Sequence, residues 1–153
     1  MEPLLTLFEN LTGHLRQLTE LAKRKTTAVR KNDLIELDQI LKEEQAQSLA
    51  LRGIDQKRTT LLRQYELDNI PLNEIPSRFP ADMQQAARDA VETMRREFSI
   101  YRSAAEIARN TLECNLHEVE KFLAAAGAAN DAGTGYHGSE VEPPAKMKSD
   151  FRA

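Results

Sequence analysis

The stretch LTELAKRKTTAVRKNDLIELDQILKEEQAQSLALRGIDQKRTTLL, Leu18–Leu62, decides the fold. On both sides of Asn32-Asp33, apolar residues recur at alternating spacings of three and four, which is typical of helices packed lengthwise against other helices. Asp33 is a good N-cap residue, and Glu36 follows it three positions later, as in a capping box. The stretch therefore predicts a helical hairpin with its turn at Asn32-Asp33.

The first predicted helix covers residues 3–31. Pro3 suits its first turn, because the missing N–H of proline would have no partner there in any case. Its apolar seam consists of Leu4, Phe8, Leu11, Leu15, Leu18, Ala22 and Val29. Lys25 is the one interruption of this seam.

The second predicted helix covers residues 33–65 and has a less apolar seam. Its seam residues are Leu34, Leu37, Leu41, Ser48, Leu51, Leu62 and Tyr65, with Glu44, Asp55 and Arg58 at the intervening seam positions. On a charged helix, such residues usually form solvent-facing pairs rather than an acid–base site. Gly53 lies inside this helix, where it costs about 1 kcal/mol relative to alanine. A close helix approach or a kink would explain it.

Three prolines, Pro71, Pro76 and Pro80, exclude a continuous helix over residues 66–80. The third predicted helix covers residues 81–123. Its seam consists of Met83, Ala87, Ala90, Met94, Tyr101, Ala105, Ala108, Leu112, Val119 and Phe122. From residue 127 onward, glycine and the Pro143-Pro144 pair dominate, and too few apolar residues remain to offset the entropy of ordering. We therefore predict a helical bundle over residues 1–126 and a flexible tail over residues 127–153.

The predicted fold is all-α, with three long antiparallel helices forming an elongated coiled-coil-like bundle. The third helix is the longest, and its C-terminal end is expected to extend about ten residues beyond the hairpin, at a rise of about 1.5 Å per residue. That end carries five large apolar residues, Leu112, Leu116, Val119, Phe122 and Leu123. An apolar stripe without cover usually marks a partner surface, and an amphipathic helix is the natural partner. A different protein and a second copy of the chain both stay open as that partner.

Composition excludes several classes of protein. The net charge of −3 argues against duplex nucleic acid as the main partner. The single cysteine excludes an internal disulfide, and Cys114 with His117 supplies too few ligands for a zinc site, so no metal is expected. The N-terminal segment lacks the basic region of a signal peptide, and no apolar run is long enough for a membrane span. The sequence thus favours a cytoplasmic protein without membrane insertion.

Motifs of catalysis are also missing from the sequence. It contains no glycine-rich phosphate loop, no GxSxG and no HExxH. The basic residues near the end of the first helix, from Lys23 to Lys31, fit a solvated helix C-terminus. We therefore expect neither an enzyme nor a cofactor.

The stretch Leu18–Leu62 resembles the FlgN-like flagellar export chaperones. The shared layout is a basic helix end, the Asn-Asp break, a Leu-x-x-Leu-x-x-Ile helix, the Glu44-Gln45 step and an arginine, Arg58, before Leu61-Leu62. The leucine-rich end of the third helix is similar to the C-terminal helix of that family. The tail is similar as well, because Tyr136 is followed closely by a glycine and Phe151 lies close to the terminal alanine.

The resemblance implies a chaperone that binds the terminal helical segment of hook-associated proteins of the hook–filament junction. It would prevent their premature assembly and deliver them to the flagellar export gate. In this reading Leu112, Leu116, Val119, Phe122 and Leu123 form the cargo-binding face, and Tyr136 docks at the export gate. A self-assembling structural coiled coil and another helical adaptor stay open as alternatives, as does a homodimer of the free protein.

Overall fold

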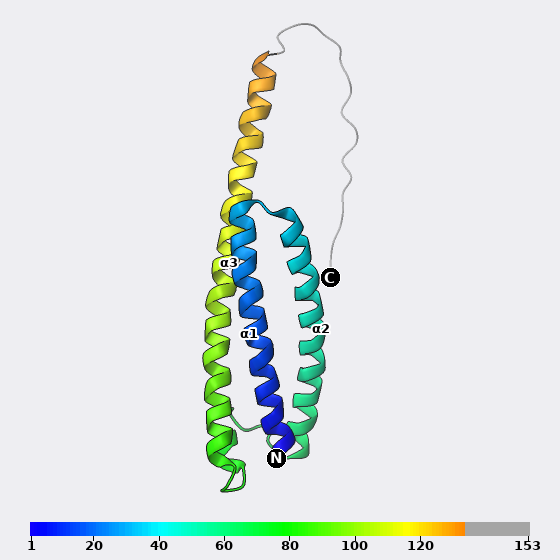
Figure 1. Cartoon of the computed structure of the whole chain (residues 1–153), viewed down its shortest axis with the longest axis vertical. Coiled ribbons are helices and arrows are strands. Elements are labelled where there is room, and N and C mark those ends of the chain that lie inside the picture. The colour runs from blue at the N-terminus through cyan, green and yellow to red at the C-terminus, as the bar shows by residue number, and fades with distance from the viewer. Residues whose placement is uncertain (134–153) are drawn as a thin grey trace. The chain divides into compact units, whose positions relative to one another are not determined.

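Three long helices make up the computed structural model, which describes the backbone of residues 1–133 and the side chains of residues 1–128. They are α1 (Glu2–Lys31), α2 (Leu34–Gln64) and α3 (Gln84–Gly133), and a short 3-10 helix, η1 (Ile75–Arg78), precedes α3. No strand occurs within residues 1–133. Consecutive long helices run in opposite directions (Figure 1). The predicted all-α fold with three long helices is confirmed.

The chain divides into two compact units, Met1–Glu118 and Val119–Ala153. The first unit contains α1, α2, η1 and the N-terminal part of α3, and the second begins within α3. Among the described residues, no helix has both the length and the apolar character needed to cross a membrane.

The turn between α1 and α2 is closed by backbone and side-chain hydrogen bonds. Asn32 adopts the left-handed conformation, with φ of 53°, which asparagine tolerates better than most residues. The N–H of Asn32 donates to the Val29 carbonyl at 3.1 Å. The N–H of Asp33 donates to the Ala28 carbonyl at 2.9 Å, and the two bonds together form a Schellman motif. The Asp33 carboxylate accepts from the Glu36 N–H at 3.0 Å, so the predicted N-cap is confirmed.

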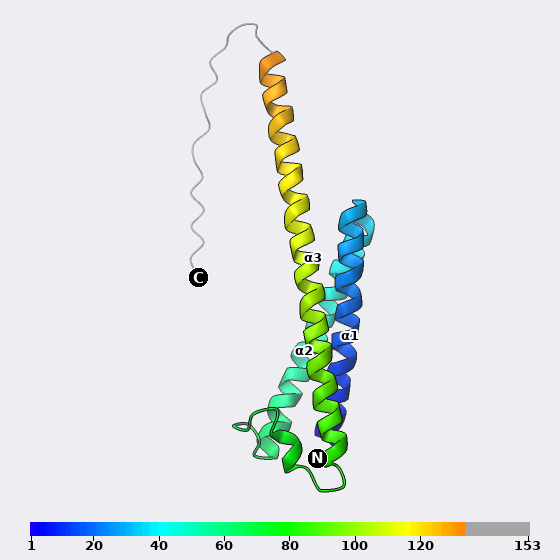
Figure 2. The same ribbon diagram turned by 90° about the vertical axis from the view of Figure 1, so that its left-hand side faces the viewer.

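The core of the first unit consists of two clusters, both built on α1. The first joins the N-terminal half of α1 to the connector and the start of α3, with Leu4, Phe8, Ile75, Phe79, Ala87 and Val91 among its buried members. The second lies nearer the α1–α2 turn and consists of Leu18, Leu21, Ala28 and Ile40. α1 runs beside the N-terminal part of α3 in both Figure 1 and Figure 2, and it supplies buried residues to both clusters.

α2 is held to the rest of the first unit by one buried side chain, by half-buried apolar residues such as Leu37 and Leu51, and by ion pairs. Ile40 is the only residue of α2 that is buried. Lys25 of α1 pairs with Glu44 at 2.6 Å. The charged residue that interrupts the apolar seam of α1 is therefore neutralised by the one that interrupts the seam of α2. Arg24 pairs with Glu36 at 2.8 Å and with Glu43 at 2.7 Å. These contacts explain how a helix with a weak apolar seam stays docked.

Two other expectations for α2 have different outcomes. Asp55 and Arg58 form an exposed pair at 2.8 Å within the helix, as predicted for charged residues on its seam. A methyl group added at Gly53 would meet no atom within 4 Å. A close helix approach therefore does not explain Gly53.

The bounds of α3 differ from the predicted range of 81–123. The helix begins at Gln84, after a turn in which the Met83 N–H donates to the Pro80 carbonyl at 2.8 Å. It continues to Gly133, through residues assigned above to the tail. The physical reason is the alanine-rich run that follows Leu123, because alanine has the highest helix propensity and a single Gly127 costs only about 1 kcal/mol.

Candidate functional site

The five apolar residues expected to bind cargo all lie on α3 and are all exposed to solvent. In the unit Met1–Glu118, Leu112 is 39% exposed and Leu116 is 59% exposed. In the unit that begins at Val119, the exposed fractions are 47% for Val119, 74% for Phe122 and 63% for Leu123. None of the five is a core residue.

Helical spacing groups four of these residues into two pairs, one in each unit. Leu112 and Leu116 lie four residues apart in the first unit, and Val119 and Leu123 lie four residues apart in the second, so each pair stacks along one face of its own part of α3. Phe122 flanks the second pair, because it lies one residue before Leu123. We call these five residues the cargo face.

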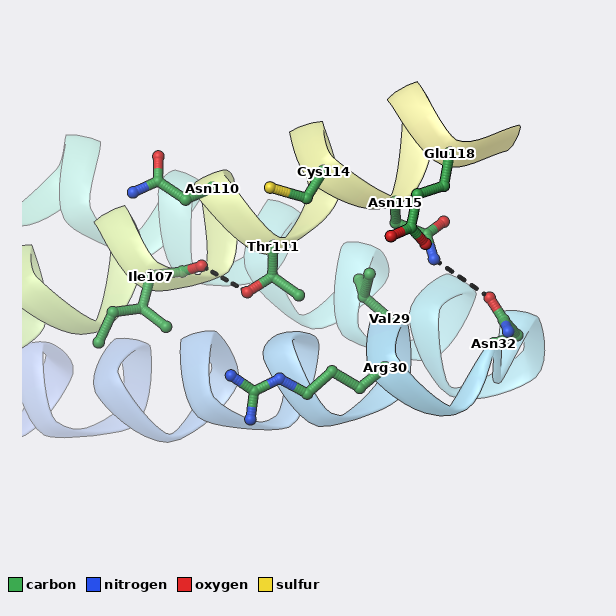
Figure 3. Close-up of a pocket in the computed structure, with 9 residues that line it drawn as sticks. All are labelled: Val29, Arg30, Asn32, Ile107, Asn110, Thr111, Cys114, Asn115 and Glu118. Carbon is green, nitrogen blue, oxygen red and sulfur yellow. Dashed lines mark hydrogen bonds between the residues drawn. The ribbon is translucent and has the colours of Figure 1, made fainter. Parts of the chain in front are cut away.

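A concavity lies where α3 passes the α1–α2 turn. It has a volume of about 530 Å³ and is lined by residues from both segments (Figure 3). The Asn115 side-chain amide donates to the Asn32 side-chain oxygen at 3.3 Å, and this bond ties α3 to the turn. Cys114 lines the concavity as an exposed free thiol. Among the described residues, no group of three or more metal-ligating side chains gathers there or elsewhere.

Charged residues beside Leu112 pair with each other within α3. Arg109 donates to the Glu113 carboxylate at 2.9 Å. This hydrogen bond and the negative charge of Glu113 raise the pKa of Arg109 above its ordinary value. Both side chains are largely exposed, so the pair is worth little in stability.

A groove along the first unit was not expected from the sequence. Its lower part, nearer the N-terminus of α1, has a volume of about 600 Å³ and is bounded by α1, α2 and α3. Leu15, Leu51 and Phe98 are among its apolar walls. Its upper part, nearer the α1–α2 turn, has a volume of about 400 Å³, and Ala22, Ser48 and Ala105 are among the residues that line it. Leu18 and Tyr101 line both parts, so the two parts adjoin at these residues.

The sequence did contain a signal for this groove, because its lining comes from the predicted seams of all three helices. Heptad spacing shows that a face is apolar, but it does not show how completely the neighbouring helices cover that face. Phe98, at 53% exposure, is a groove residue that was not assigned to the predicted seam. Tyr136, the residue expected to dock at the export gate, lies outside the described residues.

The comparisons with known proteins point to one family. The family model described as FlgN protein matches residues 1–140 of the 153-residue chain. No curated protein and no solved structure matches the chain significantly.

Proposed function

The chain belongs to the FlgN family of flagellar export chaperones, and from this premise we propose that it binds the terminal helical segment of hook-associated junction proteins. The observation that carries the proposal is the exposure of all five residues of the cargo face. A soluble helix rarely leaves so many large apolar side chains in water unless a partner covers them. The family is a chaperone family, and the proposed function involves no catalysis.

The exposure of the cargo face sets the scale of binding. Complete burial of a large apolar side chain contributes about 1.5–3 kcal/mol. Because the five residues are between 39% and 74% exposed, covering them contributes on the order of 4–8 kcal/mol. The loss of translational and rotational freedom offsets much of this gain. Such a surface suits a chaperone that holds its cargo and then releases it.

An amphipathic helix is the cargo that fits this surface. The pairs Leu112–Leu116 and Val119–Leu123 both belong to α3, and a second helix can pack along such pairs through apolar residues at intervals of three and four. Covering the segment would keep a junction protein from assembling prematurely. The chaperone would then deliver its cargo to the export gate from the cytoplasm.

Docking at the export gate is proposed for Tyr136. A tyrosine offers a large contact area at a modest entropic cost, and its place in the sequence resembles the family's tail. The measurement is the affinity of the cargo-loaded chaperone for the gate protein. An unchanged affinity in Tyr136→Ala would exclude this role and leave the cargo face untouched.

The decisive test is binding of the full-length chain to the terminal segment of a junction protein. We expect a one-to-one complex that Leu116→Asp abolishes while the helix content stays that of the wild type. Leu49→Asp is the matched control, because Leu49 is 71% exposed on α2 and lies outside the cargo face. If Leu116→Asp unfolds the protein, or if both variants bind equally well, the cargo face is assigned wrongly.

Self-assembly through the same face is the competing function. It predicts an oligomer that grows with concentration and needs no other protein. Light scattering of the purified chain separates the two, because the chaperone forms a complex of defined mass with its cargo. A homo-oligomer that persists when a junction protein is added would favour the structural coiled coil.

A further inference from the structure

A second concavity, at the connector end of the first unit, is lined by three arginines without ion-pair partners. It lies between the connector that follows α2 and the N-terminal part of α3, and it has a volume of about 560 Å³. Arg88, Arg95 and Arg96 line it from α3. All three are exposed, and none of them forms an ion pair with another residue in the part of the chain that the structure describes. The concavity thus carries positive charge that the fold itself does not use.

The spacing of charges along α3 explains why these arginines are free. Farther along the helix, Arg109 pairs with Glu113, four residues later, at 2.9 Å. Arg95 and Arg96 have no acidic residue four positions later. Glu92 also lines the concavity but forms no ion pair with the arginines beside it. Counting Glu92, the lining has a net charge of +2.

The buried part of the lining is apolar. Val91 of α3 is 4% exposed, and Pro76 of η1 is buried as well. Asn73 of the connector adds a side-chain amide, which can donate and accept hydrogen bonds. A ligand that fits this lining combines an apolar group for Val91 and Pro76 with anionic groups for the guanidinium groups.

An acidic protein segment offers this combination, because an apolar side chain can lie between aspartates or glutamates. Arginine also forms bidentate hydrogen bonds with carboxylates. A nucleic-acid backbone fits less well, since it has no apolar group for Val91 and Pro76 and the whole chain has a net charge of −3. We propose that the concavity is an interaction surface for an acidic segment of a partner protein other than the cargo.

This surface is separate from the cargo face. Along α3, Arg95 and Leu112 lie about 26 Å apart at a rise of 1.5 Å per residue, and one surface is cationic whereas the other is apolar. Both can therefore be occupied at the same time, and the proposal does not rest on cargo binding. Because the arginines are exposed, each contact is weak and is screened by salt. Such a partner would bind and dissociate readily.

The test is titration of a short fluorescently labelled peptide, in which pairs of glutamates flank single leucines, with the full-length chain at low ionic strength. We expect the wild type to bind it about tenfold more tightly than the same peptide with glutamine in place of glutamate. The triple variant Arg88→Gln/Arg95→Gln/Arg96→Gln should lose this preference and keep the helix content of the wild type. The matched control makes the same change in net charge at exposed arginines outside the concavity and should keep the preference; it is Arg52→Gln/Arg63→Gln/Arg102→Gln.

Several results would overturn the proposal. An equal loss of preference in both triple variants would assign the attraction to the overall charge of the chain. Displacement of the peptide by inorganic phosphate, at an ionic strength where chloride has no effect, would show that the arginines bind phosphate groups. A change in the mass of the free chain in the first triple variant would mean that a second copy occupies the concavity. Tighter peptide binding after removal of residues 134–153 would identify the occupant as the chain's own terminal segment.

The failure of this proposal and the failure of the proposed function are distinguishable. Leu116→Asp should lose the terminal segment of a junction protein and still bind the acidic peptide. The first triple variant should show the opposite behaviour. If the two substitutions affect both ligands alike, the two surfaces are not separate and the proposal is wrong.

Discussion

Replacing Ile40 by alanine tests whether α2 is held by a single buried side chain. Ile40 has no exposed surface and packs in the second core cluster with Leu18, Leu21 and Ala28 of α1. Truncation of a fully buried isoleucine to alanine loses its transfer free energy and leaves a cavity, and together these cost about 2–5 kcal/mol. α2 has no second buried residue to compensate, so we expect a loss of about 3 kcal/mol or more in the free energy of unfolding.

The assay is urea unfolding of the full-length chain, followed by circular dichroism at the helix band. With a slope of about 2 kcal/mol per M, a loss of 3 kcal/mol lowers the midpoint by about 1.5 M urea. Leu41→Ala is the matched control, because the next residue of α2 is also apolar but is 51% exposed. Its midpoint should shift by less than about 0.3 M, in line with a surface substitution of up to 0.5 kcal/mol.

A small difference between these two variants would refute the reasoning. If Ile40→Ala lowers the midpoint no more than Leu41→Ala does, then the half-buried apolar residues of α2 and the ion pairs of Arg24 and Lys25 hold the helix without a fully buried anchor. The double variant Lys25→Met/Glu44→Leu, measured in the same assay, would then show whether the polar contacts supply the missing stability.

Four further outcomes follow from single features of the helices. Asp33→Ala removes the N-cap of α2 and should cost about 1 kcal/mol in urea unfolding, whereas Asp33→Ser should recover most of it. Gly53→Ala should raise the free energy of unfolding by up to about 1 kcal/mol, since the site is open and helical; a loss would mean that the glycine has a structural role. The hydrogen bond from Arg24 lowers the pKa of Glu43, so its stabilisation is present above the unfolded-state pKa and is lost as the pH falls through the folded-state pKa. The free energy of unfolding should therefore decline less steeply in acid for Glu43→Gln than for the wild type. The same decline in both proteins would contradict this. The exposed thiol of Cys114 should react with a thiol reagent in the native protein as fast as in urea, and slow reaction would mean that it is covered.

The sequence predicted the helices because their apolar spacing, the Asn32-Asp33 break and the prolines of the connector are local signals. It could not show that α1 is buried on more than its seam. Thr12, Thr19 and Thr26 recur every seven residues and are all buried. Each hydroxyl donates to the carbonyl four residues earlier, at 2.8, 2.9 and 3.0 Å, so each is satisfied within the helix. Because threonine counts as polar, a pattern of apolar residues misses this second buried stripe.

The cargo face was chosen from the sequence for its apolar residues, and all five are exposed; their role stays a prediction. The groove was missed because three apolar seams that face one another usually imply a closed core. Closure depends on how far the helices diverge, and this is set by contacts far apart in the sequence. Lys25 and Glu44 illustrate the point, since each looked like a defect of its own helix and the two compensate each other only in the folded chain.

The distribution of buried residues explains how a small chain can leave apolar surface open and still fold. α1 contributes twelve buried residues and α2 contributes one. Most of the apolar burial therefore comes from the surroundings of α1, although Met94 and Ala108 of α3 line the groove and are buried as well. A substitution at an exposed position of the groove wall, for example Phe98→Asp, removes a side chain that is already half exposed. The five residues of the proposed cargo face are likewise exposed and belong to neither core cluster. Substitutions there are therefore expected to leave the fold intact, so that the proposed loss of binding can be measured in folded variants.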